Sequence, residues 1–191
     1  MIKSFGKKTK IAVFISGRGS NLKNLINHSK KKNSKFQIDL IISNKKNAKG
    51  LIFAKKNNIN FKIFSFIKLL EEEVKILDIL KKKKIKIICL AGFMKILSKN
   101  FIKKFNGKIL NIHPSLLPKY KGLNTHDRVL NNNDKYSGCT VHLVTGKLDS
   151  GKIILQKKVK VFNHDTSKTL EKRILKHEYL IYPKALNLII S

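Results

Sequence analysis

Asn111 and His113 stand two positions apart at the end of an apolar run and could act together on one reacting carbon. Pro114 biases the backbone of His113 toward an extended conformation, in which residues two apart face the same side at roughly 6.5 Å. An amide can stabilise a developing oxyanion and an imidazole can transfer protons near neutral pH, so the pair fits acyl transfer. On residue types alone, a capped strand end with a structural histidine is the better explanation.

A glycine-rich turn, residues 16–21, follows the first apolar run of the chain. Its glycines would let the backbone approach a ligand, and the N–H groups at the start of the next helix would point at an anion. Gly19, Ser20 and Asn21 are the candidate binding residues of this turn. The third glycine and the later acidic residue of a dinucleotide-binding motif are not evident, so a single phosphate monoester fits better than a pyrophosphate. A plain tight turn is the alternative.

Asp149, in the loop of residues 148–151, is a third candidate for chemistry. A carboxylate brought close to His113 would orient the imidazole and support its charged form. Taken alone, an aspartate so close to a glycine is far more often a turn residue than a catalytic one. The remaining histidines, His126 and His142 among them, show no metal-ligand spacing, so we expect no metal site.

Strand-length apolar runs that alternate with helical patterns must position these residues. The runs predict strands at residues 10–16, 38–42, 59–64, 85–91 and 108–112. Helical spacing predicts helices through residues 22–26, 48–56, 69–80 and 101–105. In the third helix Leu70, Val74, Leu77 and Leu80 lie on one side, and Ser98 is a candidate N-cap of the fourth. The alternation indicates a parallel sheet with helices on both faces.

The pattern changes in the last third of the chain. Residues 137–145 and 152–161 predict two strands joined by a short turn, which would add an antiparallel pair at the sheet edge. A final amphipathic helix begins after Asp165 and Thr166, and Pro183 would kink or interrupt it. We therefore expect an α/β, Rossmann-like open sheet, mostly parallel, with an antiparallel edge hairpin and a C-terminal helix. The length predicts one domain over residues 1–191.

Three polar segments follow strands that should end at the same edge of this sheet. They are the glycine-rich turn, residues 91–97 and the Asn111/His113 pair. Ligands of open α/β sheets bind along the carboxyl ends of the parallel strands. The shared position therefore favours one ligand site over three unrelated turns.

The net charge of +31 raises nucleic-acid binding as an alternative function. Only three of the 42 basic residues are arginines, whose planar side chain usually reads bases and phosphates, and the lysines are scattered along the chain. We therefore favour a lysine-covered surface over a dedicated nucleic-acid site. Such a surface would also attract small anionic substrates.

The sequence carries no sign of a membrane or secretory segment. No apolar run approaches the ~20 residues that a membrane-spanning helix needs, and the short apolar run after the basic start does not reach the length of a signal-peptide core. Cys89 and Cys139 are distant thiols with neither a disulfide framework nor metal-ligand spacing. We expect a cytoplasmic protein that does not associate with membranes.

Four stretches resemble the phosphoribosylglycinamide formyltransferases, a family of folate-dependent enzymes of purine synthesis. They are residues 15–22, 90–97, 110–118 and 138–151, which read ISGRGSNL, LAGFMKIL, LNIHPSLLP, and GCTVH through LDSG. The resemblance covers nearly the whole chain in order. It implies transfer of a formyl group from 10-formyltetrahydrofolate, the co-substrate, to the amine of glycinamide ribonucleotide.

The resemblance also implies roles for the three candidate catalytic residues. Asn111 would hold the formyl oxygen that becomes negative. His113 would assist proton transfer and stabilise the tetrahedral intermediate. Asp149 would orient the histidine and relay protons.

Binding residues are implied in the same way. Gly19, Ser20 and Asn21 match the family's phosphate-binding loop, and Glu178 matches a residue that contacts the ribose of the sugar nucleotide. The segment that binds the folate is matched by Met94, Lys95, Ile96 and Leu97, with Asn111 beside it.

Some positions depart from the family pattern. Gly146 stands where an acidic residue is common, Lys152 stands where a proline is common, and Lys68 is a candidate replacement for a folate-contacting arginine. These departures leave all three proposed catalytic groups in place.

Two relatives share this chemistry and are weaker alternatives. Methionyl-tRNA formyltransferase would explain the positive charge, but it normally carries a further tRNA-binding domain that 191 residues do not accommodate. Formyltetrahydrofolate deformylase normally carries an N-terminal regulatory domain. We therefore expect the sugar nucleotide as the acceptor.

Overall fold

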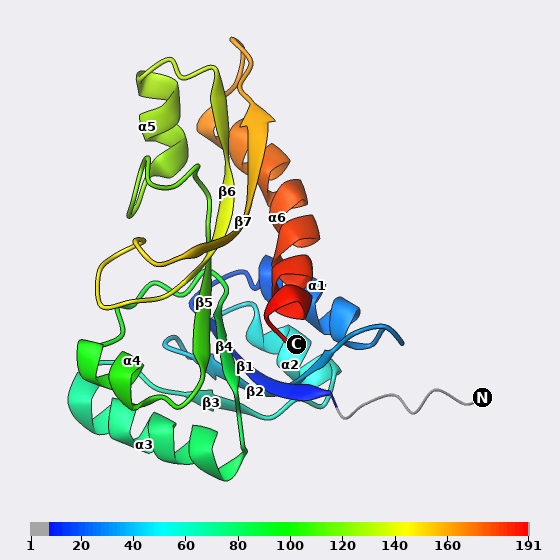
Figure 1. Cartoon of the computed structure of the whole chain (residues 1–191), viewed down its shortest axis with the longest axis vertical. Helices are drawn as coiled ribbons and strands as arrows, with labels where there is room; N and C mark the ends of the chain where they lie inside the picture. The colour runs from blue at the N-terminus through cyan, green and yellow to red at the C-terminus, as the bar shows by residue number, and fades with distance from the viewer. Residues whose placement is uncertain (1–7, 191) are drawn as a thin grey trace.

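The computed structural model describes residues 8–190, which build one seven-stranded sheet with helices on both faces (Figure 1). The strand order is β3-β2-β1-β4-β5-β6-β7. The strands are β1 (Thr9–Ile15), β2 (Phe36–Ser43), β3 (Phe61–Ile63), β4 (Ile87–Leu90), β5 (Lys108–His113), β6 (Tyr136–Leu143) and β7 (Ile153–Lys160). The helices are α1 (Ser20–Ser29), α2 (Leu51–Lys56), α3 (Leu69–Lys82), α4 (Lys99–Lys104), α5 (Thr125–Asn131) and α6 (Ser167–Ile189).

Strand direction follows the predicted pattern. The first five strands pair in parallel, whereas β6 runs antiparallel to both β5 and β7. The expected Rossmann-like open sheet with an antiparallel edge pair and a C-terminal helix is therefore confirmed. Because β1, β4 and β5 are neighbours and parallel, the segments that follow them come out at the same rim of the sheet.

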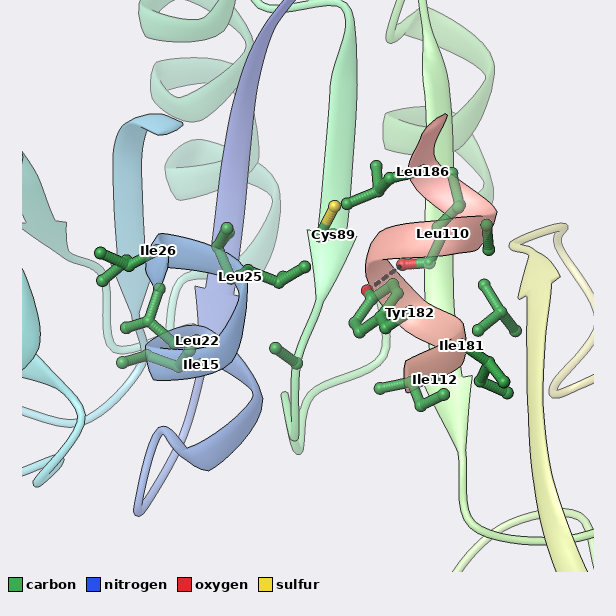
Figure 2. Close-up of a cluster of buried hydrophobic side chains, with 14 of the residues drawn as sticks. Ile15, Leu22, Leu25, Ile26, Cys89, Leu110, Ile112, Ile181, Tyr182 and Leu186 are labelled. Atoms are coloured by element: carbon green, nitrogen blue, oxygen red, sulfur yellow. Dashed lines mark hydrogen bonds between the residues drawn. The ribbon is translucent and has the colours of Figure 1, made fainter. Parts of the chain in front are cut away.

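The core lies on both faces of the sheet because successive side chains of a strand point to opposite sides. Ile11 and Val13 of β1 belong to the cluster beneath α1 and α6, whereas Phe14 belongs to the cluster beneath α3 and α4. Figure 2 shows the first cluster, in which side chains of α1 and α6 meet those of the central strands. The Tyr182 hydroxyl donates to the Leu90 carbonyl at 2.9 Å, so the one polar atom of this large side chain is satisfied.

Only some of the apolar residues that the sequence places on one side of helix α3 are buried. Leu80 is buried, but Leu70 and Val74 are 65% and 59% exposed. Ile76 and the carboxyl-bearing Glu73 occupy the buried face instead. The shift has a polar cause, because Glu73 accepts hydrogen bonds at the start of α4.

Helix α6 begins and continues for identifiable reasons. Thr166 and Thr169 form a reciprocal capping box at its first turn, as the predicted start implies. The predicted interruption at Pro183 is wrong, since the helix runs through it to Ile189. Pro183 removes the N–H that would bond the Tyr179 carbonyl, and the Asn24 side chain donates to that carbonyl instead, at 2.9 Å. Within residues 8–190, no helix is both long and apolar enough to cross a membrane.

Candidate active site

The glycine-rich turn joins β1 to α1 in a conformation that needs its glycines. Gly19 has φ +72°, and a Cβ atom on it would lie 2.4 Å from the Cα atom of Gly50. No side chain caps the start of α1, and helix geometry leaves the N–H groups of its first residues without an intrahelical acceptor. The turn can therefore present backbone donors to an anion, as Gly19, Ser20 and Asn21 were expected to do.

Asn21 of this turn contacts Glu178, the predicted ribose-binding residue. The Asn21 amide donates to Oε2 of Glu178 at 2.7 Å, and each residue is 7% exposed. Burial raises the pKa of Glu178 to about 7, although the hydrogen bond from Asn21 acts in the opposite direction. The Asn21 carbonyl oxygen is buried and has no partner among the described residues. Together, Asn21 and Glu178 form a buried polar contact between α1 and α6.

The three candidate catalytic residues converge, although Asp149 comes from a different part of the chain. Asp149 Oδ2 lies 3.4 Å from His113 Nδ1, and the Asn111 amide lies 3.4 Å from Asp149 Oδ1. The side chains of His113 and Asp149 are 6% and 8% exposed. The Gly122 N–H also donates to Asp149 Oδ2, at 2.9 Å, which fixes the carboxylate.

The carbonyl of Tyr120 sets the orientation of the His113 ring. His113 Nε2 lies 2.8 Å from this oxygen, which can only accept, so Nε2 carries a hydrogen. The nitrogen that faces Asp149 is therefore Nδ1. Any proton that His113 gains or loses resides on Nδ1, beside the carboxylate.

His142 is a fourth member of the cluster that the sequence analysis did not include. Its Nε2 lies 3.5 Å from Asp149 Oδ1 and 3.3 Å from the Asn111 amide nitrogen. Its Nδ1 lies 2.9 Å from the Leu143 carbonyl, so Nδ1 carries the hydrogen in the neutral ring. The antiparallel register sets His142 opposite Asn111, and only knowledge of that register could have revealed the contact.

Opposing effects set the protonation of the cluster. Burial lowers the pKa of His113, and the Tyr120 carbonyl and the charge of Asp149 oppose it without reversing it. Burial tends to raise the pKa of Asp149, but the contact with His142, the hydrogen bond from the Gly122 N–H and the positive charge available to the two imidazoles hold it below the usual value. Near neutral pH the cluster therefore presents an ionised carboxylate and a predominantly neutral His113.

Comparison with known proteins identifies the family. The sequence matches the family described as formyl transferase over residues 9–186. It is 45% identical over 177 residues to the phosphoribosylglycinamide formyltransferase of Haemophilus influenzae. The aligned region covers 91% of this chain and 84% of that protein. The chain belongs to the phosphoribosylglycinamide formyltransferase family. The resemblance inferred from the sequence is confirmed.

A longer relative and a solved structure agree with this family membership. The human trifunctional purine biosynthetic protein adenosine-3 is 46% identical over 189 residues, and the chain spans 19% of that protein's length. The crystal structure of phosphoribosylglycinamide formyltransferase from Brucella melitensis superposes with a TM-score of 0.91 at 42% identity, covering 97% of each chain. The fold of this chain is thus the fold of that solved member of the family.

The segment expected to bind folate has three exposed side chains and one buried side chain. Met94 and Ile96 are 63% and 73% exposed, and Lys95 is exposed beside them. The Leu97 side chain is buried in the cluster beneath α3 and α4, so only its backbone is available to a ligand. Lys68 is exposed and pairs with Glu71 at 3.8 Å.

The departures from the family pattern leave the loop that carries Asp149 in place. Gly146 packs near the Lys99 side chain, and the loop still brings Asp149 against His113. In the part of the chain that the structure describes, no group of three or more histidine, cysteine, aspartate and glutamate side chains is arranged to hold a metal ion.

Proposed function

We propose that the chain transfers the formyl group of 10-formyltetrahydrofolate to the amine of glycinamide ribonucleotide. The observation that carries the proposal is the Asn111, His113 and Asp149 cluster at the rim of the sheet that also holds the glycine-rich turn. An oxyanion donor, an imidazole and an orienting carboxylate are the groups that acyl transfer to an amine requires.

The sugar nucleotide would bind between α1 and α6. The uncapped first turn of α1, with Gly19, Ser20 and Asn21, would hold the phosphate through backbone N–H groups. Glu178 would accept hydrogen bonds from the ribose hydroxyls, and its contact with Asn21 links the two subsites. The amine would then extend toward Asn111 and His113.

The residues after β4 fit a reduced folate. Met94 and Ile96 expose large apolar side chains that can cover a flat ring, and neighbouring backbone groups can hydrogen-bond its edge. The folate supplies the formyl group. Lys95, Leu97 through its backbone, and Asn111 complete the proposed contact set.

Each catalytic side chain then has a task at a stated atom. The Asn111 amide, held only by long contacts of 3.4 and 3.3 Å, can turn to donate to the formyl oxygen as negative charge develops there. His113 Nδ1, bare in the neutral ring, can accept the proton that the amine loses. Asp149 faces that nitrogen and stabilises the imidazolium that results. The imidazolium can return this proton to the folate nitrogen as the bond between that nitrogen and the formyl carbon breaks, which releases tetrahydrofolate and the formylated amine.

The test is a transfer assay with the purified chain, glycinamide ribonucleotide and 10-formyltetrahydrofolate. We expect tetrahydrofolate and formylated sugar nucleotide in equal amounts, the first followed by absorbance and the second by mass spectrometry. Replacing the sugar nucleotide with methionyl-tRNA or with water alone distinguishes the two alternative activities. A folded chain that makes no formylated sugar nucleotide would contradict the proposal.

A further inference from the structure

The residues proposed to contact folate are held at their far end by a buried glutamate. The Ser98 N–H donates to Glu73 Oε1 at 2.8 Å, and the Ser98 hydroxyl donates to Glu73 Oε2. The same hydroxyl oxygen accepts from the Phe101 N–H at 3.0 Å and so caps α4. Glu73 of α3 therefore fixes the point at which residues 94–97 end and α4 begins.

A carboxylate buried as deeply as that of Glu73 needs hydrogen-bond donors such as those of Ser98. The residue is 3% exposed in the middle of α3, where an apolar side chain would pack at lower cost. None of the ion pairs formed among residues 8–190 includes Glu73. Its two oxygens are instead occupied by the two donors of Ser98. The carboxylate thus contributes hydrogen bonds at one particular place rather than charge pairing.

The near end of the same segment is also fixed. The Met94 N–H donates to the Ser16 hydroxyl at 2.7 Å, and the Ser16 N–H donates to the Gly92 carbonyl at 3.1 Å. The Phe93 ring packs edge-on against the Phe14 ring, with the two ring centroids 5.4 Å apart. Between the two anchors the segment is neither helix nor strand, and it presents its exposed side chains at the rim.

We propose that Glu73 is a positioning residue for the reduced folate, acting through Ser98 on residues 94–97. The inference rests on the proposed function. Without the carboxylate, Ser98 loses the acceptor of its N–H and its hydroxyl. The hydrogen bond at Met94 and the buried Leu97 side chain remain, but nothing then fixes the backbone where the segment meets α4. A backbone displacement of about 1 Å in a substrate-positioning segment is enough to weaken binding and turnover strongly.

The variants are Glu73→Ala, Glu73→Gln and Ser98→Ala, with Asp78→Asn as the matched control. Asp78 lies on the same helix, but its side chain is 55% exposed and pairs only with Lys82 among the described residues. We expect Glu73→Ala to raise the KM for 10-formyltetrahydrofolate about tenfold while the KM for glycinamide ribonucleotide changes less than about twofold. Glu73→Gln keeps one acceptor for the Ser98 N–H and should recover most of the affinity. Ser98→Ala should resemble Glu73→Ala, and the control should match wild type.

Direct titration with tetrahydrofolate and amide hydrogen exchange over residues 93–98 complete the test. Weaker folate binding and faster exchange confined to this segment in Glu73→Ala would support the inference. Wild-type folate affinity in Glu73→Ala would overturn it and leave the proposed function standing. An equal rise in both KM values, with a general loss of stability, would also overturn it by showing a purely structural role. A wild-type chain that binds no tetrahydrofolate would overturn the inference together with the proposed function.

Discussion

Asp149 receives contacts from four groups, and each of them limits what its neighbours can do. Its Oδ2 faces His113 Nδ1 and accepts from the Gly122 N–H, while its Oδ1 faces His142 and the Asn111 amide. Since a backbone carbonyl already occupies one nitrogen of each imidazole, the other nitrogens, Nδ1 of His113 and Nε2 of His142, both face one carboxylate. The charge of Asp149 is therefore coupled directly to the protonation of His113.

The Asp149→Asn variant tests this coupling through the pH dependence of turnover. The negative charge of Asp149 raises the pKa of His113 against the larger effect of burial, so removing it should lower that pKa further. We expect kcat to fall about 10²- to 10⁴-fold and its acid limb to move to lower pH. Initial rates measured across the pH range give both quantities. An acid limb that stays in place, or moves to higher pH, would show that His113 is not the titrating group.

Glu178 should make the free energy of unfolding depend on pH. Its pKa of about 7 in the folded chain lies above its pKa in the unfolded chain. The contribution of the buried acid to stability is therefore fully present at pH values below the unfolded pKa and is lost as the pH rises through about 7. A displacement of that size corresponds to roughly 3 kcal/mol at pH values above 7. Glu178→Gln should therefore be more stable than wild type at high pH and gain little in acid.

Urea unfolding of wild type and Glu178→Gln, at pH values on either side of 7, measures this difference. Glu71→Gln removes an exposed carboxylate and serves as the control, with a small difference at both pH values. A stability gain in Glu178→Gln that does not change with pH would contradict the assignment. The same variant should weaken binding of the sugar nucleotide, since it replaces the proposed acceptor for the ribose hydroxyls.

At the scale of elements, α1 and α6 are joined where α6 contains a proline. The Asn24 amide on α1 replaces the hydrogen bond that Pro183 cannot make to the Tyr179 carbonyl. This contact holds together the two helices that carry Asn21 and Glu178. The tolerance of α6 for its proline thus depends on a side chain of another helix.

A double-mutant cycle on Asn24 and Pro183 tests that dependence. Asn24→Ala should lower the free energy of unfolding by about 1–2 kcal/mol, because it leaves the Tyr179 carbonyl without a partner. In the Pro183→Ala background the new N–H can bond that carbonyl, so Asn24→Ala should cost much less. Chemical denaturation of the four proteins provides the cycle. Equal costs in both backgrounds would show that the Asn24 contact does not substitute for the hydrogen bond that Pro183 lacks.

The sequence was most informative where local chemistry decides the structure. Continuous apolar runs predicted the parallel strands, and the hydroxyl residues Ser98 and Thr166 predicted the starts of α4 and α6. The candidate ligand residues could be grouped because parallel strands end at one rim. The resemblance to a family then supplied the partnership of Asp149 with His113, which spacing alone does not contain.

The features that sequence analysis missed depend on tertiary contacts. His142 joins the cluster through the antiparallel register of β5 and β6, which depends on the whole sheet. The buried side of α3 includes Glu73 because its acceptor role lies on α4. Helix α5 buries little beyond Thr125 and Val129, so its hydrophobic pattern was too weak to predict it. For His142 and Glu73, the deciding partners lie 31 and 25 residues away along the chain.

At the scale of the whole molecule, the charge of +31 should act on the rate of substrate capture. Glycinamide ribonucleotide and folates are anions, and summed surface charge raises their local concentration. We expect kcat/KM for the sugar nucleotide to fall about tenfold as monovalent salt rises from about 0.02 to about 0.3 M, while kcat stays nearly constant. Steady-state rates over a salt series provide the measurement. A kcat/KM that does not respond to salt would show that the lysine-rich surface has no part in capture.

The most direct test of the proposed catalytic role of the Asn111, His113 and Asp149 cluster is the single-turnover rate of formyl transfer by His113→Ala, with both substrates saturating. His164→Ala replaces an exposed histidine and serves as the control, and circular dichroism verifies that each variant is folded. The cluster geometry predicts a rate about 10²- to 10⁴-fold below wild type for His113→Ala and a wild-type rate for the control. A folded His113→Ala variant that transfers the formyl group at the wild-type rate would contradict it.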